Sequence, residues 1–184
     1  MIPPTGKPQV KIRSANVNDA HVLARHRAGM FRDMGELPPD MEERLVQTSI
    51  AYFEEAIPRG EYVGWLVTLE GRDEAGANAR KVVAGAGVQL RRILPRPGVS
   101  AISLGPEAVV LNVFTEEAWR RRGLAMKLMR HVLSWARERG IERLVLHASS
   151  TGRPLYERLG FAATNEMRYL GADLLVPTIS QPST

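Results

Sequence analysis

One stretch, residues 109 to 135, constrains the fold of this chain more than any other. Residues Val109 to Phe114 are β-branched or apolar with one exception, which is typical of a buried strand. Further on, apolar residues recur at helical spacing, at Leu124, Leu128, Val132 and Trp135. The pattern therefore predicts a strand, a tight turn and a helix in direct succession.

Three arginines, Arg120, Arg121 and Arg122, stand where this helix is expected to begin. The amino end of a helix carries partial positive charge, which stabilises anions and disfavours cations. A bound anion would explain the cluster, with free N–H groups of the first turn and the guanidiniums around it. Gly123 and Ala125 have little or no side chain, so a ligand can approach the backbone closely. A solvated basic surface is the alternative interpretation.

The spacing Arg120-x-x-Gly123-x-Ala125 after an apolar strand resembles the pyrophosphate-binding turn of the GNAT N-acetyltransferase superfamily. The stretch 112–115 before it and the stretch 155–161 after it make the resemblance specific. The turn is not a P-loop, because no Gly-Lys-Ser/Thr follows, and two glycines of a dinucleotide-binding fingerprint are missing.

The order of the expected elements is similar to the GNAT fold from about Val10 to Leu170. We expect an α/β fold with a mixed sheet, in the order β-α-α-β-β-β-α-β-α-β, whose parallel strand pair splays apart. The helix expected after the turn connects the strands 108–115 and 141–147 as a crossover, which makes these two strands parallel. The expected strands are 9–13, 62–69, 82–90, 108–115, 141–147 and 161–170, and the expected long loops are 70–81 and 91–105. We expect a single domain over residues 9–171, with residues 1–8 and 176–184 as flexible ends.

The resemblance implies that acetyl-coenzyme A lies along the free edge of the strand before the turn, with its diphosphate on the turn. The coenzyme-binding residues that it implies are Val113, Phe114, Thr115, Arg120, Arg121, Arg122, Gly123, Leu124, Ala125 and Ser149. Ser149 stands where many members have an asparagine that binds the pantetheine. Tyr156 matches the tyrosine that protonates the departing thiolate, and a phenol of ordinary pKa suits that task. A buried structural tyrosine is the alternative.

The acceptor side is less clear from the sequence. Met30 and Phe31 lie at an expected helix junction and are candidates to contact the acceptor, since Met adapts to varied shapes; core packing is the alternative. A main-chain N–H near Val113 would stabilise the oxyanion. An ammonium must lose a proton before it can attack, and the candidates for this step are Asn112 as a water positioner and the carboxylates of Glu36, Glu107 and Glu166.

Composition excludes several classes of protein. The net charge is +5, but the sequence lacks the helix-turn-helix, zinc-finger and aromatic patterns of nucleic-acid binders. We therefore expect no nucleic-acid partner. There is no cysteine, and His21 and His26 lack the spacing of a metal-binding motif, so we expect no bound metal. We expect the two histidines to face solvent or to cap a helix. No apolar run reaches the length of a membrane span and no signal-peptide core is present, which predicts a cytoplasmic protein.

These features predict an acetyl-coenzyme-A-dependent N-acetyltransferase that acts on a primary amine of a small molecule or a protein. A non-catalytic module that binds acyl-coenzyme A as a sensor or partner domain is the alternative. The acceptor and the pairing into a homodimer stay open at this point.

Overall fold

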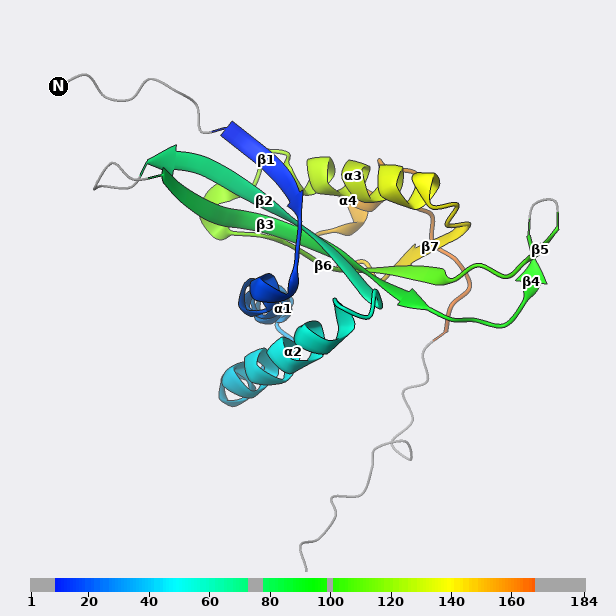
Figure 1. The fold of residues 1–184 in the computed structure, drawn as a ribbon, viewed down its shortest axis with the longest axis horizontal. Helices are drawn as coiled ribbons and strands as arrows, with labels where there is room; N and C mark the ends of the chain where they lie inside the picture. The colour runs from blue at the N-terminus through cyan, green and yellow to red at the C-terminus, as the bar shows by residue number, and fades with distance from the viewer. Residues whose placement is uncertain (1–8, 73–77, 99–100, 168–184) are drawn as a thin grey trace, which may run out of the picture.

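The computed structural model describes residues 9–72, 78–98 and 101–167 (Figure 1). The predicted flexible ends, 1–8 and 176–184, lie outside these ranges. The strands are β1 (Gln9–Ser14), β2 (Tyr62–Arg72), β3 (Asn78–Arg91), β4 (Arg96–Pro97), β5 (Ile102–Ser103), β6 (Glu107–Thr115) and β7 (Arg143–Leu146). The helices are α1 (Ala20–Asp33), α2 (Glu42–Ala56), α3 (Leu124–Glu138) and α4 (Arg153–Glu157).

The central sheet has five strands in the order β1-β2-β3-β6-β7. Neighbouring strands are antiparallel except β6 and β7, which are parallel and are joined by α3 as a crossover. The predicted mixed sheet with one parallel pair is therefore confirmed. Beyond the central sheet, β4 and β5 form a small hairpin of their own.

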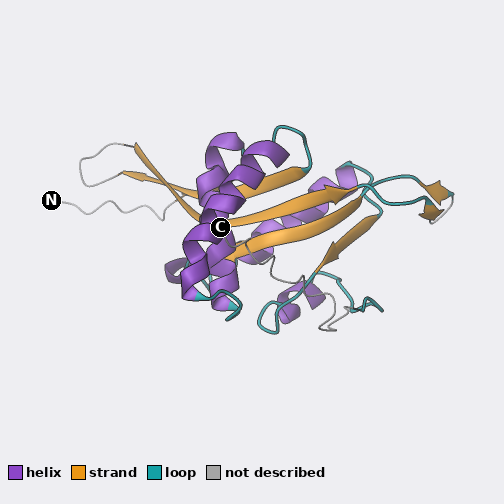
Figure 2. Ribbon diagram, turned by 90° about the horizontal axis from the view of Figure 1, so that it is seen from below, coloured by secondary structure: helices purple, strands orange, loops and turns teal. Residues whose placement is uncertain are grey.

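Helices cover both faces of the sheet. In Figures 1 and 2, α1 and α2 lie on one face, while α3 and α4 lie on the other. Alternation along β2 explains the two layers, since Trp65 and Val67 belong to the core beneath α3, whereas Tyr62 and Leu66 belong to the core beneath α1 and α2.

Three of the predicted element boundaries are corrected. The strands β2 and β3 extend into the expected 70–81 loop, because backbone pairing continues to Arg72 and Asn78. The expected 91–105 loop contains the β4–β5 hairpin. The expected last strand is absent from Phe161 to Met167, where the Phe161 ring packs against Tyr156 instead, and its remainder, 168–170, lies outside the described residues.

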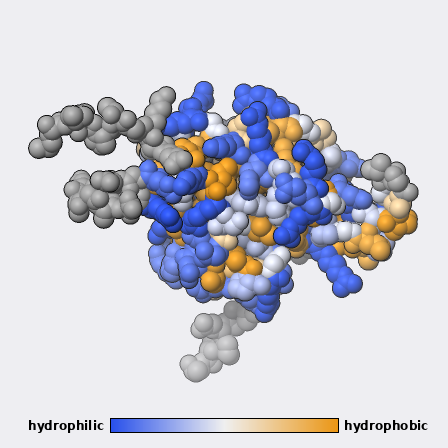
Figure 3. All heavy atoms as spheres, turned by 45° about the horizontal axis from the view of Figure 1, so that its top comes forward, coloured by the Kyte–Doolittle hydropathy of each residue, from blue (hydrophilic) through white to orange (hydrophobic). Residues whose placement is uncertain are grey.

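The β4–β5 hairpin extends from one end of the molecule (Figure 1). Ile102 of this hairpin and its neighbours in sequence, Leu94 and Leu104, have exposed apolar side chains, and Figure 3 shows apolar atoms gathered at that end. The hairpin follows the carboxyl end of β3 and precedes β6. It therefore lies at the opposite end of β6 from the turn that precedes α3.

Candidate functional site

The strand β6 contains a bulge that changes which side chains face α1 and α2. Gly87 pairs with Leu111 and Gly85 with Phe114, so two residues of β6, Asn112 and Val113, lie opposite one residue of β3. Asn112 adopts a positive φ of 54°, which is uncommon for a residue other than glycine. Before the bulge, Ala108 and Val110 pack beneath α3. After it, the Phe114 ring instead lies 5.1 Å from the ring of His26 in α1.

Gly85 and Gly87 lie two residues apart in β3 because the side chains of His26 and Tyr62 pack closely against the strand there. A Cβ on Gly85 would lie 2.8 Å from Nδ1 of His26, and a Cβ on Gly87 would overlap the Tyr62 hydroxyl. Glycine at both positions therefore makes room for side chains beneath α1 and α2.

Pairing between β6 and β7 stops before β6 ends. The register runs from Glu107 with Arg143 to Val110 with Leu146, and residues 111–115 have no β7 partner among the described residues. This is the predicted splay of the parallel pair. It leaves a strand edge with free main-chain groups, which an extended amide chain can pair with.

The segment that follows β6, residues 120–125, is here called the Gly123 turn. Gly123 is the residue before the first turn of α3, has a φ of 76°, and no side chain caps the helix there. Arg121 also adopts a positive φ, 61°, which costs a non-glycine residue about 1 kcal/mol. The first N–H groups of α3 thus lack a side-chain acceptor, as an anion-binding helix terminus requires.

The three arginines of the turn differ in their contacts. Arg120 donates from Nε to the carbonyl oxygen of Thr115 at 3.0 Å, and its Nη2 lies 2.6 Å from Oδ2 of Asp33. The Arg122 guanidinium lies 4.6 Å from the centre of the Trp119 ring. Arg121 is exposed. Closure of all three guanidiniums around one anion stays a prediction, since Arg120 and Arg122 are engaged by protein groups.

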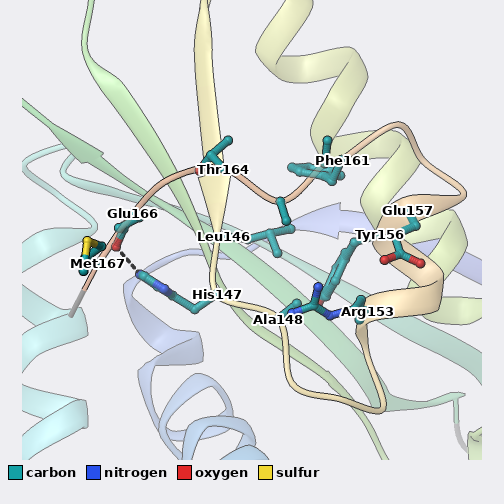
Figure 4. A pocket seen from close by; sticks show the side chains of 12 residues that line it. Leu146, His147, Ala148, Arg153, Tyr156, Glu157, Phe161, Thr164, Glu166 and Met167 are labelled. Atoms are coloured by element: carbon teal, nitrogen blue, oxygen red, sulfur yellow. Dashed lines mark ion pairs between the residues drawn. The ribbon is translucent and has the colours of Figure 1, made fainter. Parts of the chain in front are cut away.

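Tyr156 lines a cavity of about 620 Å³ beside the carboxyl end of β7 (Figure 4). The lining residues are Leu146, His147, Ala148, Arg153, Tyr156, Glu157, Phe161, Ala162, Ala163, Thr164, Glu166 and Met167. Burial raises the pKa of the Tyr156 phenol above its ordinary value of 10, so the hydroxyl keeps its proton at neutral pH. A protonated phenol is what a proton donor to a thiolate requires.

Ser149 lies in the loop between β7 and α4. Its Oγ accepts a hydrogen bond from the Gly152 amide at 3.1 Å. The hydroxyl hydrogen is still available to donate, so the predicted contact with a pantetheine carbonyl is chemically feasible.

A second cavity, of about 320 Å³, lies between α1, α2 and the sheet, and is here called the Arg27 cavity. Its lining residues are Arg27, Leu45, Thr48, Ser49, Tyr52, Phe53, Tyr62, Gln89, Leu111 and Asn112. Because of the β6 bulge, the adjacent residues Leu111 and Asn112 both line it. Asn112 Oδ1 accepts a hydrogen bond from Nη1 of Arg27 at 3.1 Å.

The other predicted acceptor and base residues are dispersed. Phe31 contacts Arg27, whose guanidinium lies 4.9 Å from the ring centre, and neither Met30 nor Phe31 lines either cavity. Glu107 pairs with Arg143 at the far end of β6. Glu36 is exposed beyond α1, and Glu166 lines the Tyr156 cavity, 3.8 Å from His147.

The expectation that His26 faces solvent or caps a helix is wrong. The ring is buried beneath α1, and burial together with the neighbouring Arg25 lowers its pKa to about 4. Its Nε2 lies 3.6 Å from the half-exposed Glu116 carboxylate, and its Nδ1 has no hydrogen-bond partner among the described residues. Burial outweighs the attraction of Glu116, because that carboxylate is still largely hydrated.

Sequence reasoning missed Arg27 and Tyr62 as site residues. Neither belongs to a motif, and their neighbours in space are far away along the chain. The paired glycines 85 and 87 were the available signal, because they indicate a side chain close to β3.

In residues 9–72, 78–98 and 101–167, no group of three or more His, Asp or Glu side chains is arranged to hold a metal ion. None of the helices in these ranges combines the length and apolar character needed to cross a membrane.

Residues 96–172 match the family model described as an acetyltransferase (GNAT) domain. The fold is similar to that of a GCN5-related N-acetyltransferase from Ralstonia eutropha JMP134, with 28% identity and a TM-score of 0.73, over 89% of this chain and 99% of that one. No curated protein matches the sequence significantly.

Two further solved structures share the fold. A predicted acetyltransferase from Clostridium acetobutylicum, crystallised with acetyl-CoA, is 25% identical, with a TM-score of 0.68 over 89% of this chain and 96% of that one. The aminoglycoside N-acetyltransferase AAC(6')-Iy, in complex with CoA, is 17% identical, with a TM-score of 0.62 over 92% of this chain and 98% of that one. At that lower identity the likeness concerns the fold alone.

Proposed function

Because this chain belongs to the GNAT N-acetyltransferase superfamily, we propose that it transfers the acetyl group of acetyl-coenzyme A directly to a primary amine of a small molecule or protein. The observation that carries the proposal is the free edge of β6 beyond Val110, which is followed, after the short 3-10 turn Glu117–Trp119, by the uncapped amino end of α3. An extended pantetheine arm and a diphosphate require this combination of groups in this order.

The coenzyme would be held mainly by main-chain groups. Val113 and Thr115 offer the strand edge to the pantetheine amides, with Phe114 between them, and Ser149 offers a hydroxyl from across the splay. The Gly123 turn, from Arg120 through Leu124 to Ala125, offers its amides to the diphosphate. Acetyl-coenzyme A supplies the activated acyl group as a thioester.

The proposed reaction requires proton transfer from the amine nitrogen and proton transfer to the departing sulfur. The amine nitrogen attacks the thioester carbonyl, and the N–H of Val113 is the proposed donor to the oxygen that becomes negative. The carbon–sulfur bond then breaks, and Tyr156 gives its proton to the sulfur that leaves. The nitrogen loses its second proton as it becomes an amide, and the uptake of one proton returns the Tyr156 phenolate to the neutral phenol. The ammonium proton must be removed beforehand, and Asn112, through a bound water, and Glu166 are the candidates that the geometry leaves nearest to the two cavities.

Coenzyme A release with a panel of amines tests the proposal. Tyr156→Phe should lower kcat by roughly a hundredfold to ten-thousandfold, the usual range for loss of a general acid, with little change in coenzyme affinity. Release that does not depend on any amine, together with intact coenzyme binding, would instead support the alternative of a binding module without turnover.

A matched pair of variants tests the base. Glu166→Gln removes a carboxylate from the cavity that Tyr156 also lines, whereas Glu107→Gln removes one at the far end of β6. If Glu166 takes the ammonium proton, its variant should lower kcat/KM by roughly a hundredfold or more, whereas Glu107→Gln should leave it unchanged. Equal kcat/KM values for both variants would leave the water on Asn112 as the proton acceptor.

A further inference from the structure

The Arg27 cavity has a charge that does not suit a simple cationic amine. Arg27 is the single charged residue among its ten lining residues, and none of them is Asp or Glu. The other polar groups are hydroxyls and amides, from Thr48, Ser49, Tyr52, Tyr62, Gln89 and Asn112. An ammonium entering this cavity would meet a positive charge without a compensating carboxylate.

Unlike several other arginines, Arg27 makes no ion pair within the described part of the chain. Within the described part of the chain, arginines paired with a carboxylate are Arg13, Arg32, Arg59, Arg80, Arg120 and Arg143. Arg27 is half-buried, yet its hydrogen bond goes to the neutral Asn112 amide and its face lies against Phe31. One of its five N–H donors is thereby used, and burial lowers the pKa of the guanidinium, which marks a cation short of stabilising anions.

Two further polar groups at the cavity wall have no partner beyond each other. The buried Asn112 amide lies close enough to the buried Tyr62 hydroxyl to affect its pKa, but neither Asn112 Nδ2 nor that hydroxyl makes a hydrogen bond of good geometry with the described residues. Gly87 makes room for the Tyr62 hydroxyl, since a side chain there would overlap it. Buried donors are costly when they are left unpaired, so a molecule rich in acceptor atoms would be stabilised here.

We propose that the acceptor amine carries an anionic group, a carboxylate or a phosphate, and that Arg27 binds this group in the cavity between α1, α2 and the bulge of β6. This inference rests on the proposed acetyl transfer. The volume of about 320 Å³ suits a small molecule. Asn112, which accepts a hydrogen bond from Arg27, directly precedes Val113, whose amide is proposed to contact the thioester, so the cavity adjoins the proposed reaction centre.

Matched amines separate the role of the anion from the role of size. Coenzyme A release would be compared for L-leucine and L-leucinamide, and for 2-aminoethyl phosphate and 2-aminoethanol. The anionic member of at least one pair should have a kcat/KM at least tenfold higher. The leucine pair tests a carboxylate, and the aminoethanol pair tests a phosphate. Equal kcat/KM values within both pairs would overturn the inference and leave the proposed acetyl transfer intact.

Variants of Arg27 give a second readout. Arg27→Gln should raise KM for the preferred anionic amine about tenfold to a hundredfold, with kcat changed less, since a hydrogen bond between charged groups is lost. Arg27→Lys should retain part of the affinity. Arg25→Gln removes the same charge from an exposed position on the same helix and should leave KM unchanged. An equal effect of Arg27→Gln on the neutral amine would contradict the inference.

A binding measurement covers the case without turnover. If the wild-type protein acetylates none of these four amines, the panel of amines described above still tests the proposed acetyl transfer. Calorimetric titration of 2-aminoethyl phosphate and L-leucine into the protein with coenzyme A then tests the cavity itself. Binding that Arg27→Gln weakens at least tenfold supports an anion site, whereas binding equal in both proteins, or absent from both, overturns it.

Discussion

The two sides of the proposed reaction are built from different kinds of groups. The coenzyme side, residues 111–125, offers main-chain groups from one continuous stretch of chain. The Arg27 cavity offers side chains from α1, α2, β2, β3 and β6, and the Arg27–Asn112 hydrogen bond alone spans 85 residues of sequence. A site made of backbone depends on local conformation, whereas a site made of side chains depends on how distant elements pack.

This difference fits the tasks of the two sides. A diphosphate and a pantetheine arm are the same in every reaction that uses coenzyme A, so main-chain amides at a helix end and a strand edge suffice. The acceptor must be distinguished from other amines, which takes particular side chains in particular places. Substitution of the side chains that line the Arg27 cavity can thus change the acceptor, while the position of α1 stays coupled to the coenzyme turn through the Asp33–Arg120 ion pair.

The largest expected effect is the loss of coenzyme A affinity when an acidic residue is placed at the amino end of α3 rather than at its carboxyl end. Gly123 and Gly140 both have positive φ values, 76° and 64°, and a Cβ on either meets no atom within 4 Å. Gly123→Asp places a carboxylate against the proposed diphosphate and should weaken coenzyme A binding roughly a hundredfold to a thousandfold, because like charges repel. Calorimetry would measure this affinity, and Gly140→Asp, with similar backbone strain, should bind coenzyme A normally. Equal losses in both variants would argue against the turn as the diphosphate site.

The next effect concerns stability on the acceptor side and depends on pH. His26 has a pKa of about 4 when folded and about 6.5 when unfolded, so the unfolded chain binds the proton more readily. Stability is therefore full above pH 6.5 and falls as the pH drops toward 4, by about 3 kcal/mol in the lower limit. Urea unfolding at pH 7 and pH 4.5 would measure the loss, and His26→Gln should reduce its dependence on pH. An unchanged pH dependence in that variant would contradict the role of His26.

A third effect tests whether the β3 glycines shape the Arg27 cavity. Gly87→Ala places a methyl group against the Tyr62 hydroxyl, which should lower the free energy of unfolding by roughly 1–3 kcal/mol, as overpacking commonly does. The variant should also raise KM for the acceptor while leaving coenzyme A affinity unchanged. Gly105→Ala, where the nearest atom lies at 3.9 Å, serves as the control for thermal unfolding and KM. A weaker affinity for coenzyme A in Gly87→Ala would contradict the claim that Gly87 shapes the Arg27 cavity alone.

The smallest expected effect is that of Arg121→Gly, in which the melting temperature reports backbone strain and the affinity for coenzyme A reports the lost charge. Arg121→Gly removes the cost of a positive φ, about 1 kcal/mol, and also removes a guanidinium from the turn. The melting temperature should hold or rise, while coenzyme A binding should weaken about tenfold, as expected for one lost charged contact. Arg120→Ala should cost less affinity, since Asp33 and Thr115 already engage that side chain. A stronger effect at Arg120 than at Arg121 would reverse this assignment.

The sequence alone determined the strand, turn and helix around Gly123 and the parallel pair that α3 connects. These features depend on short-range properties: apolar periodicity, the backbone freedom of glycine and the handedness of a crossover. The same local reasoning failed at the segment 161–167, whose apolar Phe161 was expected in a strand. Its ring found a partner in Tyr156, and tertiary packing overrode strand propensity there.

Only the tertiary structure decided which side chains meet at the acceptor side. Strict alternation along β6 would place Asn112 and Phe114 beneath α3 with Val110, and one extra residue at the bulge turns both toward α1 and α2. The same packing buries His26 and brings Arg27 and Tyr62 to Asn112. A bulge is set by how β3, β6 and α1 fit together, and no periodicity within one strand specifies it.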